Sequence, residues 1–245
     1  MPAFFILLFV IIFKHLNEIL LNPFYLCSSV DKIITKRKNM TSFDERAKDW
    51  DSDPQKVERA RVVAEAIRNA IPLTSEMTSL EYGCGTGLLS FALQSELGQI
   101  ALADTSQGML DVLNEKIAAA GVTNMRSTRL DLSIDSLPAE RFSLTYSLLT
   151  LHHIEDPKAI IKKFHALLEP AGILCIADLD KEDGTFHPAG TTDIHMGFER
   201  AELQRWVEDA GFTEVKFSTA FEIKKKVGDA EKLFPVFLLI ARKAK

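Results

Sequence analysis

Residues 80–87 read LEYGCGTG, and this stretch decides the fold that we expect. A short apolar run leads into three glycines at every second position, Gly83, Gly85 and Gly87. Glycine lets the backbone turn with a positive φ and lets a ligand approach closely. An amphipathic helix is predicted over residues 88–97, and its first turn offers free N–H groups and a positive dipole end. Strand, glycine turn and helix in this order predict the cofactor-binding start of a Rossmann-like sheet.

The glycine spacing indicates which cofactor binds. The dinucleotide fingerprint is GxGxxG, whereas here Glu81 stands two residues before the first glycine of a GxGxG motif. A carboxylate repels a pyrophosphate and attracts an ammonium group. At this point the sequence resembles the class I S-adenosylmethionine-dependent methyltransferases, in particular the small-molecule branch that includes the ubiquinone and menaquinone methyltransferases. The resemblance implies that Glu81 holds the methionine ammonium group and that Gly83, Gly85 and Gly87 admit the cofactor, with Cys84 a small neighbour rather than a nucleophile.

Composition favours one α/β domain in a reducing compartment, so we expect a cytoplasmic protein. The 245 residues are 47% hydrophobic, which is enough for one full core. A net charge of −5 does not favour nucleic acid as a partner. The cysteines Cys27, Cys84 and Cys175 form no CxxC motif and no cluster with histidines at zinc spacing, so we expect no metal. Nothing in the sequence indicates an oligomeric state.

The first 39 residues differ from the rest, with an apolar run at residues 3–13 and five basic residues against two acidic ones. The run is shorter than the roughly 20 residues of a membrane-spanning helix. Three interpretations stay open: a membrane anchor through residues 3–26, an interfacial helix, or a segment absent from the working protein. We favour the last, because Met40 opens a normal start for the resembled family. The predicted domains are therefore a leader, residues 1–39, and a methyltransferase domain, residues 40–245.

Two further acids follow predicted strands. Asp104 ends an apolar strand that begins at residue 99, where a Rossmann-like sheet presents a carboxylate to ribose hydroxyls. The resemblance extends to the following TSQGML, which places Thr105 and Met109 beside the cofactor. Asp131 follows the strand 125–130. In the resembled family this acid takes the adenine amino group, and the next N–H, that of Leu132, meets the ring; a capping role is the alternative for either acid.

The strand 141–147 is followed by SLLTLHH, residues 147–153, which should line the methyl-transfer cavity. Ser147 is expected beside the cofactor. The stretch lacks the [DN]PP[FY] motif of enzymes that methylate exocyclic amino groups of bases. If the acceptor is a hydroxyl or an enolisable carbon, a base with a pKa near 7 assists. His152 is the first candidate for this catalytic base, with His153 and His187 behind it, and a histidine turned into the core is the alternative for each.

The acceptor is expected to meet two segments. The stretch DLDKEDGTFH, residues 178–187, follows the fifth strand, and its Asp178, Asp180 and His187 are candidate residues for a cationic or polyhydroxyl substrate, or for an occasional metal. The other interpretation is a solvated, turn-rich loop. In the resembled family the N-terminal segment folds over the site, so Trp50 is a candidate wall.

The resemblance predicts an α/β, Rossmann-like three-layer sandwich whose seven-stranded, mostly parallel sheet has the order 3-2-1-4-5-7-6, with the last strand antiparallel. The implied reaction is in-line transfer of a methyl group from S-adenosylmethionine to a small-molecule acceptor. Two other functions stay open: an S-adenosylmethionine-binding protein without transferase activity, and a nicotinamide-dependent oxidoreductase, which Glu81 and the glycine spacing disfavour.

Overall fold

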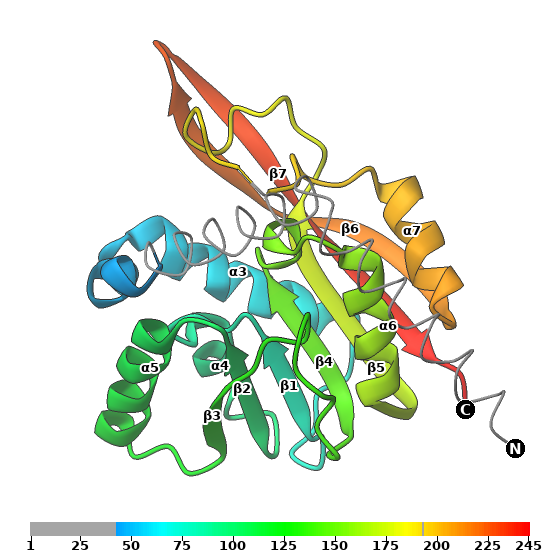
Figure 1. Ribbon diagram of the computed structural model, residues 1–245. Helices are drawn as coiled ribbons and strands as arrows, with labels where there is room; N and C mark the ends of the chain where they lie inside the picture. Colours follow the sequence, from blue (N-terminus) through cyan, green and yellow to red (C-terminus); the bar gives the residue numbers. More distant parts are fainter. Residues whose placement is uncertain (1–42, 193) are drawn as a thin grey trace, which may run out of the picture. The chain divides into compact units, whose positions relative to one another are not determined.

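The computed structural model describes residues 43–192 and 194–245. The predicted leader, residues 1–39, lies outside the described residues. A single seven-stranded sheet has the order β3-β2-β1-β4-β5-β7-β6, which confirms the predicted order (Figure 1). Neighbours from β3 to β5 pair in parallel, and β7 pairs antiparallel with both β5 and β6. The strands are β1 (Ser79–Tyr82), β2 (Ile100–Asp104), β3 (Met125–Arg129), β4 (Phe142–Leu148), β5 (Leu168–Leu179), β6 (Phe212–Val227) and β7 (Ala230–Lys243).

Helices cover both faces of the sheet and so complete three layers. Apolar side chains of α3 (Pro54–Ala70), α4 (Leu88–Leu93) and α5 (Gln107–Ala120) share one core with one face. Those of α6 (Pro157–Leu167) and α7 (Arg200–Asp209) share a second core with the opposite face. Strand side chains alternate between the faces, and each buried face needs its own apolar cover.

The helix boundaries follow local capping chemistry. The Asp53 carboxylate caps α3, and Pro54 stands at its first position. A left-handed glycine, Gly121, ends α5. The predicted helix 88–97 ends earlier, at Leu93, and Gly98, which leads into β2, lies against the backbone of Ser75 and Met77 in the loop before β1.

The hairpin of β6 and β7 is long, with strands of 16 and 14 residues, and its turn end extends beyond the rest of the sheet (Figure 1). Gly228 lies in this turn with a φ of +61°, and Val227 pairs with Ala230. Two lysines near the turn, Lys225 and Lys232, bond to the segment that follows β5. The hairpin therefore supports the β5–α7 loop, residues 180–199.

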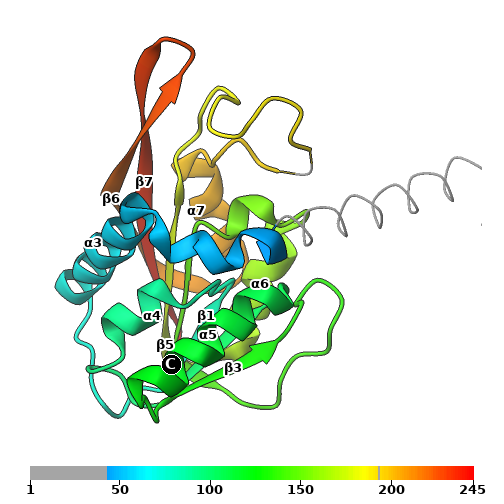
Figure 2. The ribbon, with the colours of Figure 1, turned by 90° about the vertical axis from the view of Figure 1, so that its left-hand side faces the viewer.

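Residues 43–52, which end in the 3-10 helix η1 (Ala47–Ser52), run between α5 and the β5–α7 loop (Figure 2). A second 3-10 helix, η2 (Leu151–His153), follows β4. Both lie at the carboxyl ends of the parallel strands, where open α/β sheets bind ligands. Among the described residues, we find no helix with the length and apolar character needed to cross a membrane.

Candidate active site

The glycine turn between β1 and α4 has the conformation that its sequence predicts. The φ angles of Gly83, Gly85 and Gly87 are +71°, +53° and +79°. Gly85 is the one of the three that faces open space, because a Cβ placed there would meet no atom nearer than Met109 Sδ at 3.9 Å. A ligand can therefore approach the backbone at Gly85.

At the other two glycines, packing within the protein leaves no room for a side chain. A Cβ at Gly83 would lie 2.2 Å from the Thr150 side chain, which donates a hydrogen bond to the Gly83 carbonyl. A Cβ at Gly87 would lie 2.6 Å from Leu113 of α5. These two positions bring β4 and α5 close to the turn, so they contribute to the site by shaping it.

Asp104, at the end of β2, ties the turn to the next strand. One carboxylate oxygen accepts a hydrogen bond from Gly85 N at 2.7 Å, and the other accepts one from Ser106 N at 2.8 Å. Burial raises the pKa of Asp104, and these hydrogen bonds oppose that shift. The carboxylate lies at the strand end where the sequence predicted it, and its neighbours Thr105 and Met109 lead into α5.

Glu81 lies deeper than its predicted role suggests. Its side chain is buried under α4, only 2% exposed, and accepts a hydrogen bond from Ser90 Oγ. Ser90 Oγ lies 2.5 Å from Tyr146 Oη, so the three groups form a buried network. Burial raises the pKa of Glu81 to about 8. The side chain therefore favours its protonated form at neutral pH, and its contact with an ammonium group stays a prediction.

At β3 the structure shows different partners from those that the resemblance implies. The Leu132 N–H donates to Tyr82 Oη at 3.0 Å, and Lys163 donates to the Leu132 carbonyl. The Asp131 carboxylate accepts from Ser133 N at 2.9 Å, which is the capping role that sequence alone left open. The predicted contact of Leu132 N–H with adenine would require Tyr82 to give up this bond.

Cys84 and Ser147 are both buried. Burial raises the pKa of the Cys84 thiol, which fits the small-neighbour interpretation better than a nucleophile. Ser147 Oγ makes no hydrogen bond to any residue that the structure describes.

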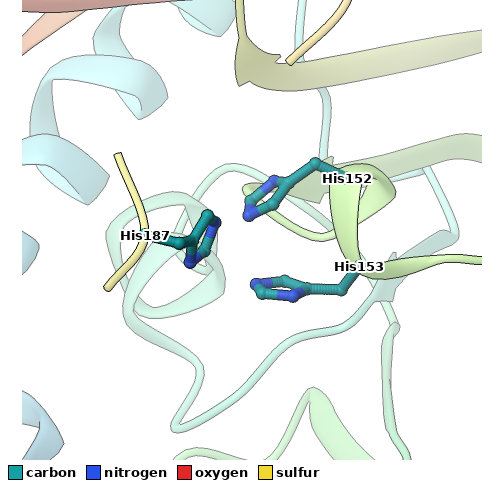
Figure 3. Close-up of side chains that lie close together, drawn as sticks. All are labelled: His152, His153 and His187. Carbon is teal, nitrogen blue, oxygen red and sulfur yellow. The ribbon is translucent and has the colours of Figure 1, made fainter. Parts of the chain in front are cut away.

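Three histidines meet beside the ends of β4 and β5 (Figure 3). His152 and His153 come from η2, and His187 comes from the β5–α7 loop. Their ring centroids are 4.1 Å apart for His152 and His153, 5.2 Å for His152 and His187, and 5.3 Å for His153 and His187. Burial lowers the pKa of His153 to about 2 and that of His187 to about 4. Both rings are therefore neutral at physiological pH.

Asp178 lies behind this cluster, on β5. Its Oδ1 is 2.6 Å from His152 Nδ1, and its side chain is fully buried. The same carboxylate accepts from the backbone N–H of His152 and of Leu179. The structure thus makes Asp178 a partner that orients His152, whereas the sequence suggested a substrate contact.

The other carboxylates of the β5–α7 loop also have partners inside the protein. Asp180 forms a two-point ion pair with Arg200, at 2.7 and 2.6 Å. Glu182 Oε2 accepts from three successive backbone N–H groups, residues 184–186, at 2.8–3.0 Å. Asp183 accepts from Lys232 and from Thr185. Of the two interpretations of this stretch, the arrangement matches the turn-rich loop. The Asp180 carboxylate, which we expected to contact substrate, already has a partner within the protein.

With this geometry described, the chain can be compared with known proteins. A family model described as a methyltransferase domain matches residues 80–172. An uncharacterized methyltransferase of Schizosaccharomyces pombe is 38% identical over 120 residues, 46% of this chain and 42% of that protein. A ubiquinone biosynthesis O-methyltransferase of Coxiella burnetii is 26% identical over 192 residues, 71% of this chain and 81% of that protein. This chain has a class I S-adenosylmethionine-dependent methyltransferase domain.

A solved methyltransferase supports the same fold. Phosphoethanolamine N-methyltransferase 2 of Haemonchus contortus, in complex with S-adenosyl-L-methionine, aligns with a TM-score of 0.59 at 16% identity. The alignment covers 71% of this chain and 50% of that chain. The cofactor of the domain is S-adenosylmethionine, and the open backbone at Gly85 beside the Asp104 carboxylate fits such a ligand.

The methyltransferase domain also uses residues that the sequence did not single out. Asp51 accepts from Thr86 Oγ1 of the glycine turn at 2.5 Å and pairs with Lys116 of α5 at 2.5 Å. Asp44 accepts from Ser106 Oγ at 2.5 Å and from Gly108 N at 2.9 Å. These bonds hold residues 43–52 across the cofactor end of the sheet. No sequence motif marks them, because they join residues 35 to 65 positions apart.

Trp50 belongs to the same segment, and the ring of Phe43 links it to the histidines. Its ring centroid is 5.9 Å from that of Phe43, which meets His153 edge-on at 5.5 Å. Lys56 lies over the Trp50 ring at 3.9 Å. The segment therefore reaches the histidine cluster through Phe43, and contact of Trp50 with substrate stays a prediction.

Proposed function

We propose that this protein transfers a methyl group from S-adenosylmethionine to an oxygen of a small-molecule acceptor. One structural relationship carries the proposal: the Gly85–Asp104 end of the sheet and the buried His152 lie at the carboxyl ends of neighbouring strands. An oxygen acceptor agrees with the ubiquinone biosynthesis O-methyltransferase among its relatives. A cytoplasmic location and a small acceptor agree with the negative net charge.

S-adenosylmethionine supplies an already activated methyl group, so the protein contributes mainly orientation, where well-placed reactants gain ~7–11 kcal/mol. Asp104 and the Gly85 backbone bind the cofactor. Residues 43–52 cover it through the Asp51–Thr86 bond and restrict the entry of water. His152 Nε2 accepts the proton of the acceptor hydroxyl, and Asp178 stabilises the charge that develops on the ring.

The neutral histidines around His152 support this role. His153 and His187 stay uncharged because burial lowers the pKa of each. They form an uncharged, aromatic wall together with Phe43 and Phe186. Such a wall suits a flat acceptor with few charges.

The experiment is calorimetric titration of the full chain with S-adenosylmethionine and S-adenosylhomocysteine. We expect binding to weaken at least tenfold in Asp104→Ala and to stay unchanged in Asp111→Ala, whose carboxylate lies exposed on α5. Absence of binding in the wild-type chain would refute the proposal.

A screen of phenol, catechol and hydroxyquinone acceptors then tests the transfer. We expect turnover that falls at least 100-fold in His152→Ala. Cofactor binding without turnover on any acceptor would favour the alternative, an S-adenosylmethionine-binding protein without transferase activity. Turnover that survives in His152→Ala would remove this residue from the mechanism.

A further inference from the structure

The histidine cluster has a feature that methyl transfer does not require. Three imidazoles from two separate segments turn their nitrogens toward one another (Figure 3), and one ligand atom from each lies within 4.8 Å of the others. We propose that His152, His153 and His187 bind one divalent metal ion of the class that imidazole favours, with Zn²⁺ as the type case. The absence of zinc-type spacing led us to expect no metal, and this proposal replaces that expectation.

The first support for the proposal is that two buried ring nitrogens have no hydrogen-bond partner. His152 Nε2 and His187 Nε2 are buried and make no hydrogen bond to any residue that the structure describes. The exposed fraction of His152 is 1%. Buried polar atoms without partners are costly, so protein structures rarely contain two of them in one cluster. A metal ion between these rings would satisfy both nitrogens at once.

The distances suit a small cation. A tetrahedral Zn²⁺ at about 2.0–2.1 Å from each nitrogen places two ligand nitrogens roughly 3.3 Å apart. The ligand atoms lie within 4.8 Å of one another, so metal binding requires the rings to draw closer together by about an ångström or more. Carbonyl and carboxylate ligands, which Mg²⁺ and Ca²⁺ prefer, are not part of this group.

Asp178 supplies the outer partner that metal-binding histidines commonly have. Its carboxylate accepts from His152 Nδ1 at 2.6 Å and so leaves the Nε2 lone pair facing the cluster. A histidine that ligates a metal usually donates its other N–H to a carboxylate or carbonyl, which fixes the ring and makes it a stronger ligand. The Asp178 charge also offsets part of the cation's charge in this buried place.

The surrounding charges act in both directions. Neutral imidazole is the form that binds metal, and burial lowers the pKa of His153 and His187 well below neutrality. Arg46 and Lys225 also lower the pKa of His187, and their positive charges oppose a cation. Asp178 is the carboxylate that faces the cluster and raises that pKa. Because the nearby positive charges oppose a cation, an ion at this site must be held by bonds to the three nitrogens and not by electrostatic attraction alone.

His187 is held in place by its own loop. Glu182 binds three backbone N–H groups up to Phe186, and Lys225 donates to the Phe186 carbonyl. The Phe186 ring packs against Phe234 of β7, with centroids 5.2 Å apart. These contacts fix the residue before His187. The loop therefore holds His187, the third ligand, close to the two histidines of η2. Three protein ligands leave a fourth position of a tetrahedral ion for water or an acceptor oxygen. In this metal-bound form His152 Nε2 is a ligand, so the ion replaces it in the role of lowering the pKa of the acceptor hydroxyl.

The experiment titrates the metal-free full chain with Co²⁺, whose visible absorption strengthens in a four-coordinate site, and with Zn²⁺ by calorimetry. We expect one equivalent of each ion to bind and azide to change the Co²⁺ spectrum by occupying the fourth position. His153→Asn and His187→Asn should each weaken binding at least tenfold. His165→Asn is the matched control, because His165 packs against Phe212 outside the cluster and should bind Co²⁺ like the wild type.

Two results would overturn the proposal: absence of stoichiometric binding by the wild-type chain, or an affinity in both cluster variants equal to that of the wild type. If a variant fails to fold, the wild-type Co²⁺ spectrum still decides, since a six-coordinate spectrum contradicts the four-coordinate site that we propose. S-adenosylmethionine binding by the same samples is measured separately. Loss of metal binding with intact cofactor binding distinguishes failure of this inference from failure of the proposed methyl transfer.

Discussion

His152 Nδ1 lies 2.6 Å from Asp178 Oδ1, and the two side chains are buried at the ends of neighbouring strands. His152 follows β4, and Asp178 lies on β5, which pairs with β4. A carboxylate can only accept here, so the neutral ring carries its proton on Nδ1. This relationship makes Nε2 the nitrogen that faces the cavity, where it can accept a proton in the metal-free protein or ligate the proposed metal ion, but not both at once.

Nitrogen-15 NMR of the metal-free protein should therefore assign the Nδ1–H tautomer to His152. We expect Asp178→Asn to weaken this preference, because an amide can also donate and favours the opposite tautomer. His165→Asn should leave the His152 signals unchanged. An Nε2–H tautomer in the wild type would contradict the orientation that we derive from the Asp178 contact.

Removal of the Asp178 side chain should also cost stability. Asp178→Ala leaves the buried His152 ring N–H and two backbone N–H groups without their acceptor. We expect a loss of about 3–5 kcal/mol in the free energy of unfolding, compared with less than ~1 kcal/mol for Asp111→Ala on the surface of α5. Urea unfolding measures both, and similar losses would show that Asp178 does not organise this site.

The open side of the glycine turn allows a matched pair of substitutions. Gly85 and Gly121 both have positive φ, and a Cβ meets nothing within 4 Å at Gly121. An alanine costs roughly 1–2 kcal/mol of backbone strain at either position. We expect Gly85→Ala alone to weaken S-adenosylmethionine binding, at least tenfold, because its methyl group fills the space beside Asp104. Calorimetry measures the affinities, and equal affinity in both variants would place the cofactor elsewhere.

Much of the cofactor end could be predicted from sequence because its residues are close together in the chain. The turn at Gly83, Gly85 and Gly87 and the acid at Asp104 follow from strand–turn–helix order, which local patterns encode. The sheet order came from resemblance, and the structure confirms it. The depth of Glu81 was not predictable, since strand periodicity shows that a side chain faces a helix layer but not whether a ligand reaches it.

The histidine cluster was beyond prediction for a different reason. Sequence marked His152, His153 and His187 singly, but their meeting depends on the course of the β5–α7 loop over residues without a regular repeat. The same holds for Asp178, whose position behind His152 depends on the register between β4 and β5. Tertiary contacts of this kind leave no local signal in the sequence. The spacing of the histidines along the chain therefore could not indicate the metal site that we propose.

Close packing of Gly108 against Asp44 gives a test of the cover over the cofactor site. A Cβ at Gly108 would lie 2.9 Å from Asp44 Cα and 3.0 Å from its carbonyl oxygen. Gly108→Ala favours α5 itself by up to ~1 kcal/mol but displaces residues 43–52. We expect faster hydrogen exchange in this segment and weaker cofactor binding. Gln107→Ala, next to it and exposed, is the control, and unchanged exchange in Gly108→Ala would show that the cover is not anchored there.

Burial of Glu81 predicts how stability depends on pH. Its pKa is about 8 in the folded protein, against 4.5 ordinarily. Between these values the unfolded chain ionises while the folded protein keeps the proton, so this group's contribution to the free energy of unfolding is full below about pH 4.5 and falls as pH rises toward 8, by up to ~1.4 kcal/mol per pH unit. Glu81→Gln removes this dependence. Thermal unfolding at a series of pH values should show the wild type losing stability relative to the variant, and parallel curves would contradict the buried, protonated state.

The same proton tests the predicted contact of Glu81 with the cofactor. An ammonium group that reaches Glu81 favours the ionised carboxylate, so S-adenosylmethionine binding near pH 7 should release a proton. Calorimetry in two buffers with different heats of ionisation measures this release directly. We expect a buffer-dependent binding heat in the wild type and none from this site in Glu81→Gln. Equal heats in both buffers for the wild type would mean that Glu81 serves only the network with Ser90 and Tyr146, and that another group holds the ammonium.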